Sequence, residues 1–124
     1  NPQTYGGWSA TNLPPSSAAP HQDANGNGIP NLIEFIAPQP LSVLFDNGIA
    51  TLTLSRNSAA RGVTLIVEFS ENLIAWEPLA TSVNGAPPTG PASITESSGT
   101  IRTLLIQHPA FPYRSFYRVR AVMP

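Results

Sequence analysis

The chain has 124 residues, of which 41% are hydrophobic, and this composition predicts one globular domain and excludes a disordered segment. Only 10% of the residues are charged, all six basic residues are arginine, and the net charge is −1, so the sequence carries no electrostatic footprint for a nucleic acid. No apolar run approaches the roughly 18 residues of a membrane helix, and the absence of cysteine excludes disulfides.

Residues 1–20 are a leader rich in proline, serine and alanine. The chain begins without a methionine or a signal peptide, and we interpret it as a mature product that acts outside the cell. Tyr5 and Trp8 are three residues apart, a spacing that places both on one face of a short helical turn. Residues 14–20, PPSSAAP, predict an extended, polyproline-like connector after that turn.

Residues 21–40 contain a loop with the spacing of a calcium site and a short exit helix. The stretch 23–34, DANGNGIPNLIE, matches D-x-[DN]-x-[DN]-G-x5-E at every specified position. Ca²⁺ takes six to eight oxygen ligands, which such a loop supplies from alternate residues, while a glycine at its sixth position permits the sharp turn. The predicted metal ligands are Asp23, Asn25, Asn27, the carbonyl oxygen of Ile29, Asn31 and Glu34.

The alternative interpretation of this loop is a turn rich in asparagine and glycine that caps a helix and leaves Glu34 exposed. The simultaneous fit of Asp23, Gly28 and Glu34 favours the metal site. Because only two carboxylates are present, the expected dissociation constant is weak, about 10⁻⁴–10⁻³ M, as in extracellular modules. Residues 30–37 predict the exit helix, with proline at its first position and an apolar face that packs on the following domain. That face consists of Leu32, Ile33 and Ile36.

From residue 41 the hydrophobic period changes to two, which is typical of strands. Asp46-Asn47-Gly48 predicts a hairpin turn. Within 62–70 one face of the strand is apolar and the other carries Thr64, Glu68 and Ser70. The fold predicted for residues 41–124 is therefore mainly β, an antiparallel β-sandwich of about seven strands preceded by the calcium loop and its short helix. The apolar face consists of Val63, Leu65, Val67 and Phe69, and the expected strands span 41–45, 49–56, 62–70, 79–83, 93–97, 100–107 and 115–122.

Four stretches of the sequence, YGGW, DANGNGIPNLIEF, VEFSENLIAWEPL and SFYRVRAV, resemble a module found at the ends of large secreted proteins of environmental bacteria. In that family a loop similar to dockerin, thrombospondin type 3 and EF-hand calcium loops leads into a β-sandwich with an S-x-x-L-x-x-W motif and a closing F-[FY]-R-V. The motifs match here at Ser70, Leu73 and Trp76 and at Phe116 to Val119, whereas asparagine replaces the usual aspartate at positions 25 and 27. The resemblance implies a secreted, non-catalytic role and names no ligand.

Other candidate residues have plainer interpretations. His21 and His108 lack a catalytic partner at a telling spacing, and we expect no enzyme. An anion-binding stripe of Arg102, Arg114, Arg118 and Arg120 is weighed against a solvated face balanced by glutamates. A sugar-stacking platform of Trp76, Tyr113 and Tyr117 is weighed against packing, with Trp76 buried against the apolar row of 62–70.

Two classes of function follow from these observations. The first is a secreted structural subunit that associates with copies of itself in an extracellular fibre or surface layer, with Tyr5, Trp8 and Leu13 of the leader or an edge strand docking on a neighbour. The low charge favours this class because repulsion between copies is small. The second is a carbohydrate-binding accessory module of a larger secreted enzyme, with a glycan as its partner.

Overall fold

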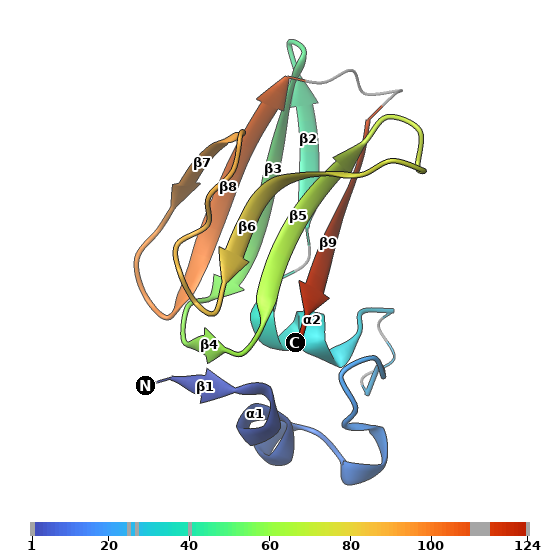
Figure 1. Ribbon diagram of the computed structural model, residues 1–124, viewed down its shortest axis with the longest axis vertical. Coiled ribbons are helices and arrows are strands. Elements are labelled where there is room, and N and C mark those ends of the chain that lie inside the picture. Colours follow the sequence, from blue (N-terminus) through green and yellow to red (C-terminus); the bar gives the residue numbers. More distant parts are fainter. Residues whose placement is uncertain (1, 25, 27, 40, 110–114, 124) are drawn as a thin grey trace.

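The computed structural model describes residues 2–24, 26, 28–39, 41–109 and 115–123. It is a β-sandwich of two antiparallel sheets with two short helices at one end, which we name the base (Figure 1). The mainly β, antiparallel fold predicted from the sequence is confirmed. One sheet has the order β2 (Ser42–Asp46), β3 (Ile49–Asn57), β8 (Ile101–Pro109), β7 (Ser93–Glu96), and the other has the order β6 (Glu77–Val83), β5 (Thr64–Ser70), β9 (Phe116–Val122).

The turn between β2 and β3 follows from local sequence. Asn47 and Gly48 have φ angles of 53° and 77°, in the left-handed region that asparagine and glycine adopt most readily. This geometry pairs Asp46 with Ile49 and sets the register of the hairpin. The predicted hairpin is confirmed.

The core lies between the two sheets, where the alternating residues of their inner faces meet. The row predicted to face inward on β5 is buried, and across the sandwich it meets the paired inward residues of β3 and β8. Each such side chain contributes about 1.5–3 kcal/mol relative to an exposed position. The buried residues of this layer are Val63, Leu65, Val67 and Phe69 from the smaller sheet and Leu52, Leu54, Leu104 and Ile106 from the larger one.

Different chemistry closes the two ends of the core. At the base, the inward rows of β3 and β8 end in Arg56 and Arg102, which are direct cross-strand partners. At the opposite end His108 continues the inward row of β8, and its ring centre lies 4.6 Å from that of Phe69. The apolar core is therefore bounded by the guanidinium groups of two arginines at the base and by aromatic rings at the opposite end.

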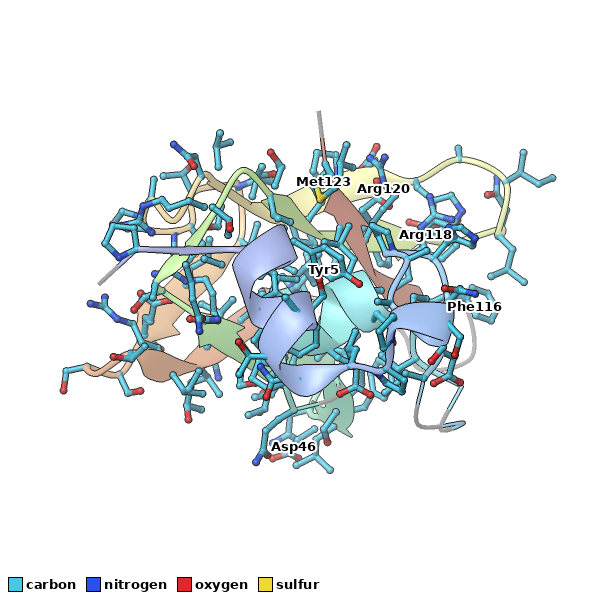
Figure 2. The ribbon with its side chains drawn as sticks, turned by 90° about the horizontal axis from the view of Figure 1, so that it is seen from below. Tyr5, Asp46, Phe116, Arg118, Arg120 and Met123 are labelled. Atoms are coloured by element: carbon cyan, nitrogen blue, oxygen red, sulfur yellow. The ribbon has the colours of Figure 1, made fainter. Side chains whose placement is uncertain are left out.

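The leader folds onto its own chain. A two-residue strand, β1 (Gln3–Thr4), pairs in parallel with β4 (Ala60–Arg61), and helix α1 (Tyr5–Asn12) follows it. Tyr5 and Trp8 share a face of α1, as their spacing predicts, and both rings pack on Phe35 of helix α2 (Asn31–Ile36) at centroid distances of 5.8 and 5.3 Å. Figure 2 shows Tyr5 between the two helices.

One observation corrects the prediction for the leader, and another shows what holds the leader in place. Residues Pro15–Ser17 form a short 3-10 helix, so the connector is not extended throughout. The buried Asn57 at the end of β3 donates hydrogen bonds from its Nδ2 to Gln3 Oε1 and to the carbonyl oxygen of Phe35. This one side chain thereby ties the leader and α2 to the larger sheet.

Helix α2 covers the base of the sandwich. It begins at Asn31, one residue after the proline that the sequence places at its first position. Leu32 and Ile36 are buried and Ile33 is partly buried against the core, as predicted. Phe35, the aromatic residue of this helix, is also buried, although the predicted apolar face did not include it.

Candidate functional site

The loop before α2 folds back on its first residue. Asp23 accepts a hydrogen bond through Oδ2 from the backbone N–H of Gly28 at 2.6 Å. Gly26 and Gly28 have φ angles of 69° and 83°, which glycine adopts without the steric cost of a side chain. The first and sixth positions of the predicted calcium motif are thus in direct contact.

The side chain of Asn31 holds the two ends of the loop. It is buried, and its Oδ1 accepts a hydrogen bond from the backbone N–H of Ala24 at 3.0 Å. Its Nδ2 donates to the carbonyl oxygens of Ser17 and Ala19 at 2.7 and 2.9 Å. Asn31 therefore tethers the leader to the loop, a structural role that the spacing of a metal motif does not reveal.

The described members of the motif suit a hard cation. Asp23 is exposed at the start of the loop, and Glu34 is partly buried in the first turn of α2. Together with the carbonyl of Ile29 they offer only oxygen donors, the type that Ca²⁺ prefers. The predicted ligands Asn25 and Asn27 lie outside the described residues. Within the described part of the chain, no group of three or more histidine, cysteine, aspartate or glutamate residues suits a metal.

Trp76 does not occupy the core position predicted for it. Its side chain is half-buried, and the guanidinium carbon of Arg118 lies 4.0 Å from the centre of its ring. A cation over an indole contributes about 0.5–1 kcal/mol at an exposed site. The prediction that Trp76 packs against Val63, Leu65, Val67 and Phe69 is therefore wrong.

The reason for the position of Trp76 lies in the segment before it. Ser70 Oγ accepts hydrogen bonds from the N–H groups of Asn72 and Leu73, and Asn72 Oδ1 accepts from those of Ile74 and Ala75. These short-range bonds curl the chain after β5. The S-x-x-L-x-x-W spacing thus builds a turn, and the serine and the asparagine contribute more to it than the exposed leucine.

The described arginines of the candidate stripe belong to separate clusters, and each contacts a glutamate, as the alternative to an anion-binding stripe expects. Arg118 and Arg120 lie on the same side of β9, as Figure 2 shows, and both contact Glu68 through Oε1, at 2.8 and 3.2 Å. Burial raises the pKa of Glu68, but the hydrogen bonds from the two arginines outweigh it, so the pKa lies below its usual value. Arg102 belongs to the other sheet, where it contacts Glu96, and Arg114 lies outside the described residues.

The two histidines lie far apart in the chain. His21 is exposed, and His108 is half-buried with its Nδ1 3.4 Å from the hydroxyl of Tyr117. Burial lowers the pKa of His108, partly opposed by Glu77 and Glu71. Tyr117 packs against the core, as the packing alternative to a sugar-stacking platform expects, and Tyr113 lies outside the described residues.

The leader residues predicted to dock on a neighbour have contacts within their own chain. Tyr5 belongs to the core and donates its hydroxyl hydrogen to the carbonyl oxygen of Ala18 at 2.7 Å. Trp8 packs against the same core, and Leu13 is partly buried at the end of α1. Because the chain itself already buries Tyr5, this ring offers little surface to a neighbour, whereas Trp8 and Leu13 are only partly buried and docking through them stays a prediction.

Sequence reasoning missed the cluster at the base. Arg56 is buried, and Glu96 accepts two hydrogen bonds from it, from Nε at 2.6 Å and from Nη2 at 2.8 Å. Only its position in the inward register of β3 signals the role of Arg56, and that register favours an apolar residue. Forty residues separate the two partners, a distance over which no spacing rule applies.

Comparison with protein-family models, curated proteins and solved structures finds no match to this chain. No helix among the described residues is long and apolar enough to cross a membrane.

Proposed function

We propose that this chain is a secreted, non-catalytic β-sandwich that Ca²⁺ stabilises and that serves as a structural subunit associating with copies of itself in an extracellular fibre or surface layer. The observation that carries the calcium part is the loop itself. Its first and sixth positions are joined by the Asp23–Gly28 hydrogen bond, and Glu34 follows at the twelfth position on α2.

A cation in this loop acts as a clip at the base of the sandwich. The loop connects the leader to α2, and α2 packs on the core through Leu32, Phe35 and Ile36. Asp23, Ile29 and Glu34 supply oxygen ligands from both sides of the turn. Under this proposal the cation binds the folded loop and not the unfolded chain, so binding stabilises the folded state by mass action.

Calcium is expected to raise the melting temperature, and a chelator to lower it. At 10- to 100-fold excess over the dissociation constant, the gain in unfolding free energy is about 1.4–2.7 kcal/mol, or several degrees. Glu34→Gln removes one carboxylate from the predicted ligands and is expected to lose most of the calcium-dependent shift. Differential scanning calorimetry with CaCl₂ or EDTA measures both effects.

Glu77→Gln is the matched control, since Glu77 is exposed at the start of β6 and outside the loop. It should retain the full calcium response. A melting temperature that is the same in calcium and in EDTA, or a Glu34→Gln variant that responds like the parent chain, contradicts the metal site.

Open sheet edges support the assembly part of the proposal. Within the described chain β2 pairs only with β3 and β7 only with β8, so each is an edge of the larger sheet. Edge strands accept a further strand through their unpaired backbone groups, and lysine, a common protection, is absent from the sequence. Leu44 on β2 is 69% exposed, so this edge presents an apolar side chain where a protected edge commonly carries a charge.

A carbohydrate-binding module is the second candidate function, and Trp76 is the observation that favours it. Its indole is half-buried on the surface, with Arg118 over one face of the ring, instead of lying in the core. Aromatic rings that remain accessible stack on sugars through the same apolar faces that pack in interfaces. The polar guanidinium next to the ring suits a hydroxyl-rich ligand.

One pair of measurements separates these two functions. The structural proposal expects the calcium-loaded chain to sediment as polymers that electron microscopy shows as fibres or layers, with association lost when Leu44→Lys places a charge on the edge strand β2. The glycan candidate expects a monomer whose Trp76 emission is quenched by oligosaccharides, measured in a Trp8→Phe background that leaves one indole. A monomer at high concentration contradicts the structural proposal, and unchanged emission contradicts the glycan candidate.

A further inference from the structure

A pocket of about 350 Å³ opens at the base of the sandwich, apart from the calcium loop. Three arginines, Arg56, Arg61 and Arg102, line it together with the turn after β6 and the segment around β4. Figure 1 shows that β4, the end of β6 and the start of β8 converge at this end of the molecule. With Pro2 of the leader, the pocket is therefore built from four separate parts of the chain.

Arg56 forms the inner wall of this pocket in a fixed orientation. Besides its two hydrogen bonds to Glu96, its Nη1 donates to Ser82 Oγ and to the carbonyl oxygen of Gly85, both at 3.3 Å. The side chain is 1% exposed. A guanidinium that is fixed by its neighbours presents its charge without an ordering cost when a ligand arrives.

Arg61 is fixed without any carboxylate. Its Nη1 donates to the carbonyl oxygens of Ser58 and Ala60 at 2.8 and 3.0 Å, and no acidic side chain in the described ranges forms an ion pair with it. The guanidinium lies where a Cβ on Gly85 would stand, because such an atom would overlap Arg61 Nη1. Glycine at position 85, with φ of 80°, is thus what allows the arginine to lie there.

The charges around the pocket do not balance. Three guanidinium groups face a single carboxylate, that of Glu96, which contacts Arg56 at 2.6 Å and Arg102 at 3.2 Å. Two positive charges remain in excess among the described residues that surround the pocket. In a concave site with protein walls, the field of such charges is focused and attracts anions.

We propose that this pocket binds an oxyanion, that is, a carboxylate, sulfate or phosphate group. Planar guanidinium groups recognise these groups through paired N–H donors. Arg61 and Arg102 supply the donors, because their Nη2 groups make no hydrogen bond to any described residue, while Arg56 contributes charge from the wall. The site does not depend on the calcium loop.

The test is a titration of the ¹⁵N-labelled, full-length chain with sodium sulfate or phosphate, followed by heteronuclear NMR. Saturable shifts are expected for the amides of Arg61, Gly85 and Arg102, and no such shifts in sodium chloride of equal ionic strength. Arg61→Gln should weaken the affinity at least 10-fold. Since Arg61 is partly exposed, this variant is expected to stay folded, and its NMR spectrum reports whether it does.

Arg120→Gln is the matched control, because it removes the same charge on the outer side of β9, where the arginine is 48% exposed. It should leave sulfate binding unchanged. Gly85→Ala provides a second variant of unchanged charge, whose Cβ would meet the guanidinium of Arg61 and the carbonyl oxygen of Ala60, and it should also weaken binding. Because the φ angle at this position is positive, the NMR spectrum must first show that the variant stays folded. Shifts that do not saturate, or equal affinity in the parent chain and Arg61→Gln, overturn the proposal.

The oxyanion has two sources, a soluble ligand and an acidic side chain of a second copy, and sedimentation distinguishes them. If a second copy supplies the group, saturating sulfate dissociates the complex and Arg61→Gln associates less. If a soluble ligand supplies it, sedimentation is unchanged in both cases while the titration remains saturable. Both outcomes support the oxyanion pocket and identify what fills it.

Discussion

Phe35→Ala is expected to lower the free energy of unfolding by about 3–5 kcal/mol, the usual cost of removing a buried phenylalanine. The ring is 1% exposed and lies between both helices and the core. Tyr5 and Trp8 meet it with centroid distances of 5.8 and 5.3 Å, and aromatic pairs add about 0.5–1.5 kcal/mol beyond the area they bury. Urea denaturation followed by circular dichroism measures the loss.

Phe116→Ala is the matched control for this change. Phe116 is the same residue type on the edge strand β9, but 39% of it is exposed, so its removal leaves no enclosed cavity. A clearly smaller loss is expected. Equal losses for the two variants would show that the leader and α2 do not enclose Phe35 in solution.

Glu96→Gln is expected to cost about 3–5 kcal/mol, because it leaves a charge buried without its counter-ion. The partner that stays behind, Arg56, is 1% exposed, and glutamine offers its Nε and Nη2 one neutral acceptor in place of two charged carboxylate oxygens. Arg102 faces Arg56 directly across the sheet, and without the carboxylate these two like charges repel. Thermal and urea unfolding at pH 7 measure the effect.

Glu68→Gln tests whether the burial of the arginine partner is what makes the loss of stability in Glu96→Gln large. In that cluster the carboxylate is the buried member, while its partners Arg118 and Arg120 are 44% and 48% exposed and stay hydrated after the change. The same substitution should therefore cost much less, on the order of 1 kcal/mol. An equal loss at both sites would show that the burial of Arg56 is not what makes Glu96 important.

The lowered pKa of Glu96 determines how the effect of Glu96→Gln on stability depends on pH. The hydrogen bonds from Arg56, followed by the attraction of the nearby arginine charges, hold the pKa of Glu96 below its usual value of 4.5 despite burial. A lowered pKa in the folded state adds stability that is present above pH 4.5 and is lost as the pH falls through the folded pKa. The difference between the parent chain and Glu96→Gln should thus be largest near neutral pH and shrink in acid.

The sequence by itself determined the features that depend on neighbouring residues. Asn47-Gly48 specifies the β2–β3 turn because these two residues accept positive φ. Alternation along β5 specifies which face is apolar, since side chains of a strand point to opposite sides in turn. Asp23, Gly28 and Glu34 have the spacing of a calcium-loop motif, and the Asp23–Gly28 hydrogen bond lies within that same loop.

Only the tertiary structure decided the features that depend on which segments become neighbours. Arg56 meets Glu96 because β3 and β7 flank β8, an order that no local pattern encodes. Trp76 lies beside Arg118 and not in the core because β9 pairs with β5, next to the turn that carries the indole. The leader, too polar and proline-rich to form a core of its own, becomes ordered because Phe35 gives Tyr5 and Trp8 an apolar surface on which to pack. Such contacts join residues far apart in the chain, and their free energy exists only once the sheets have assembled.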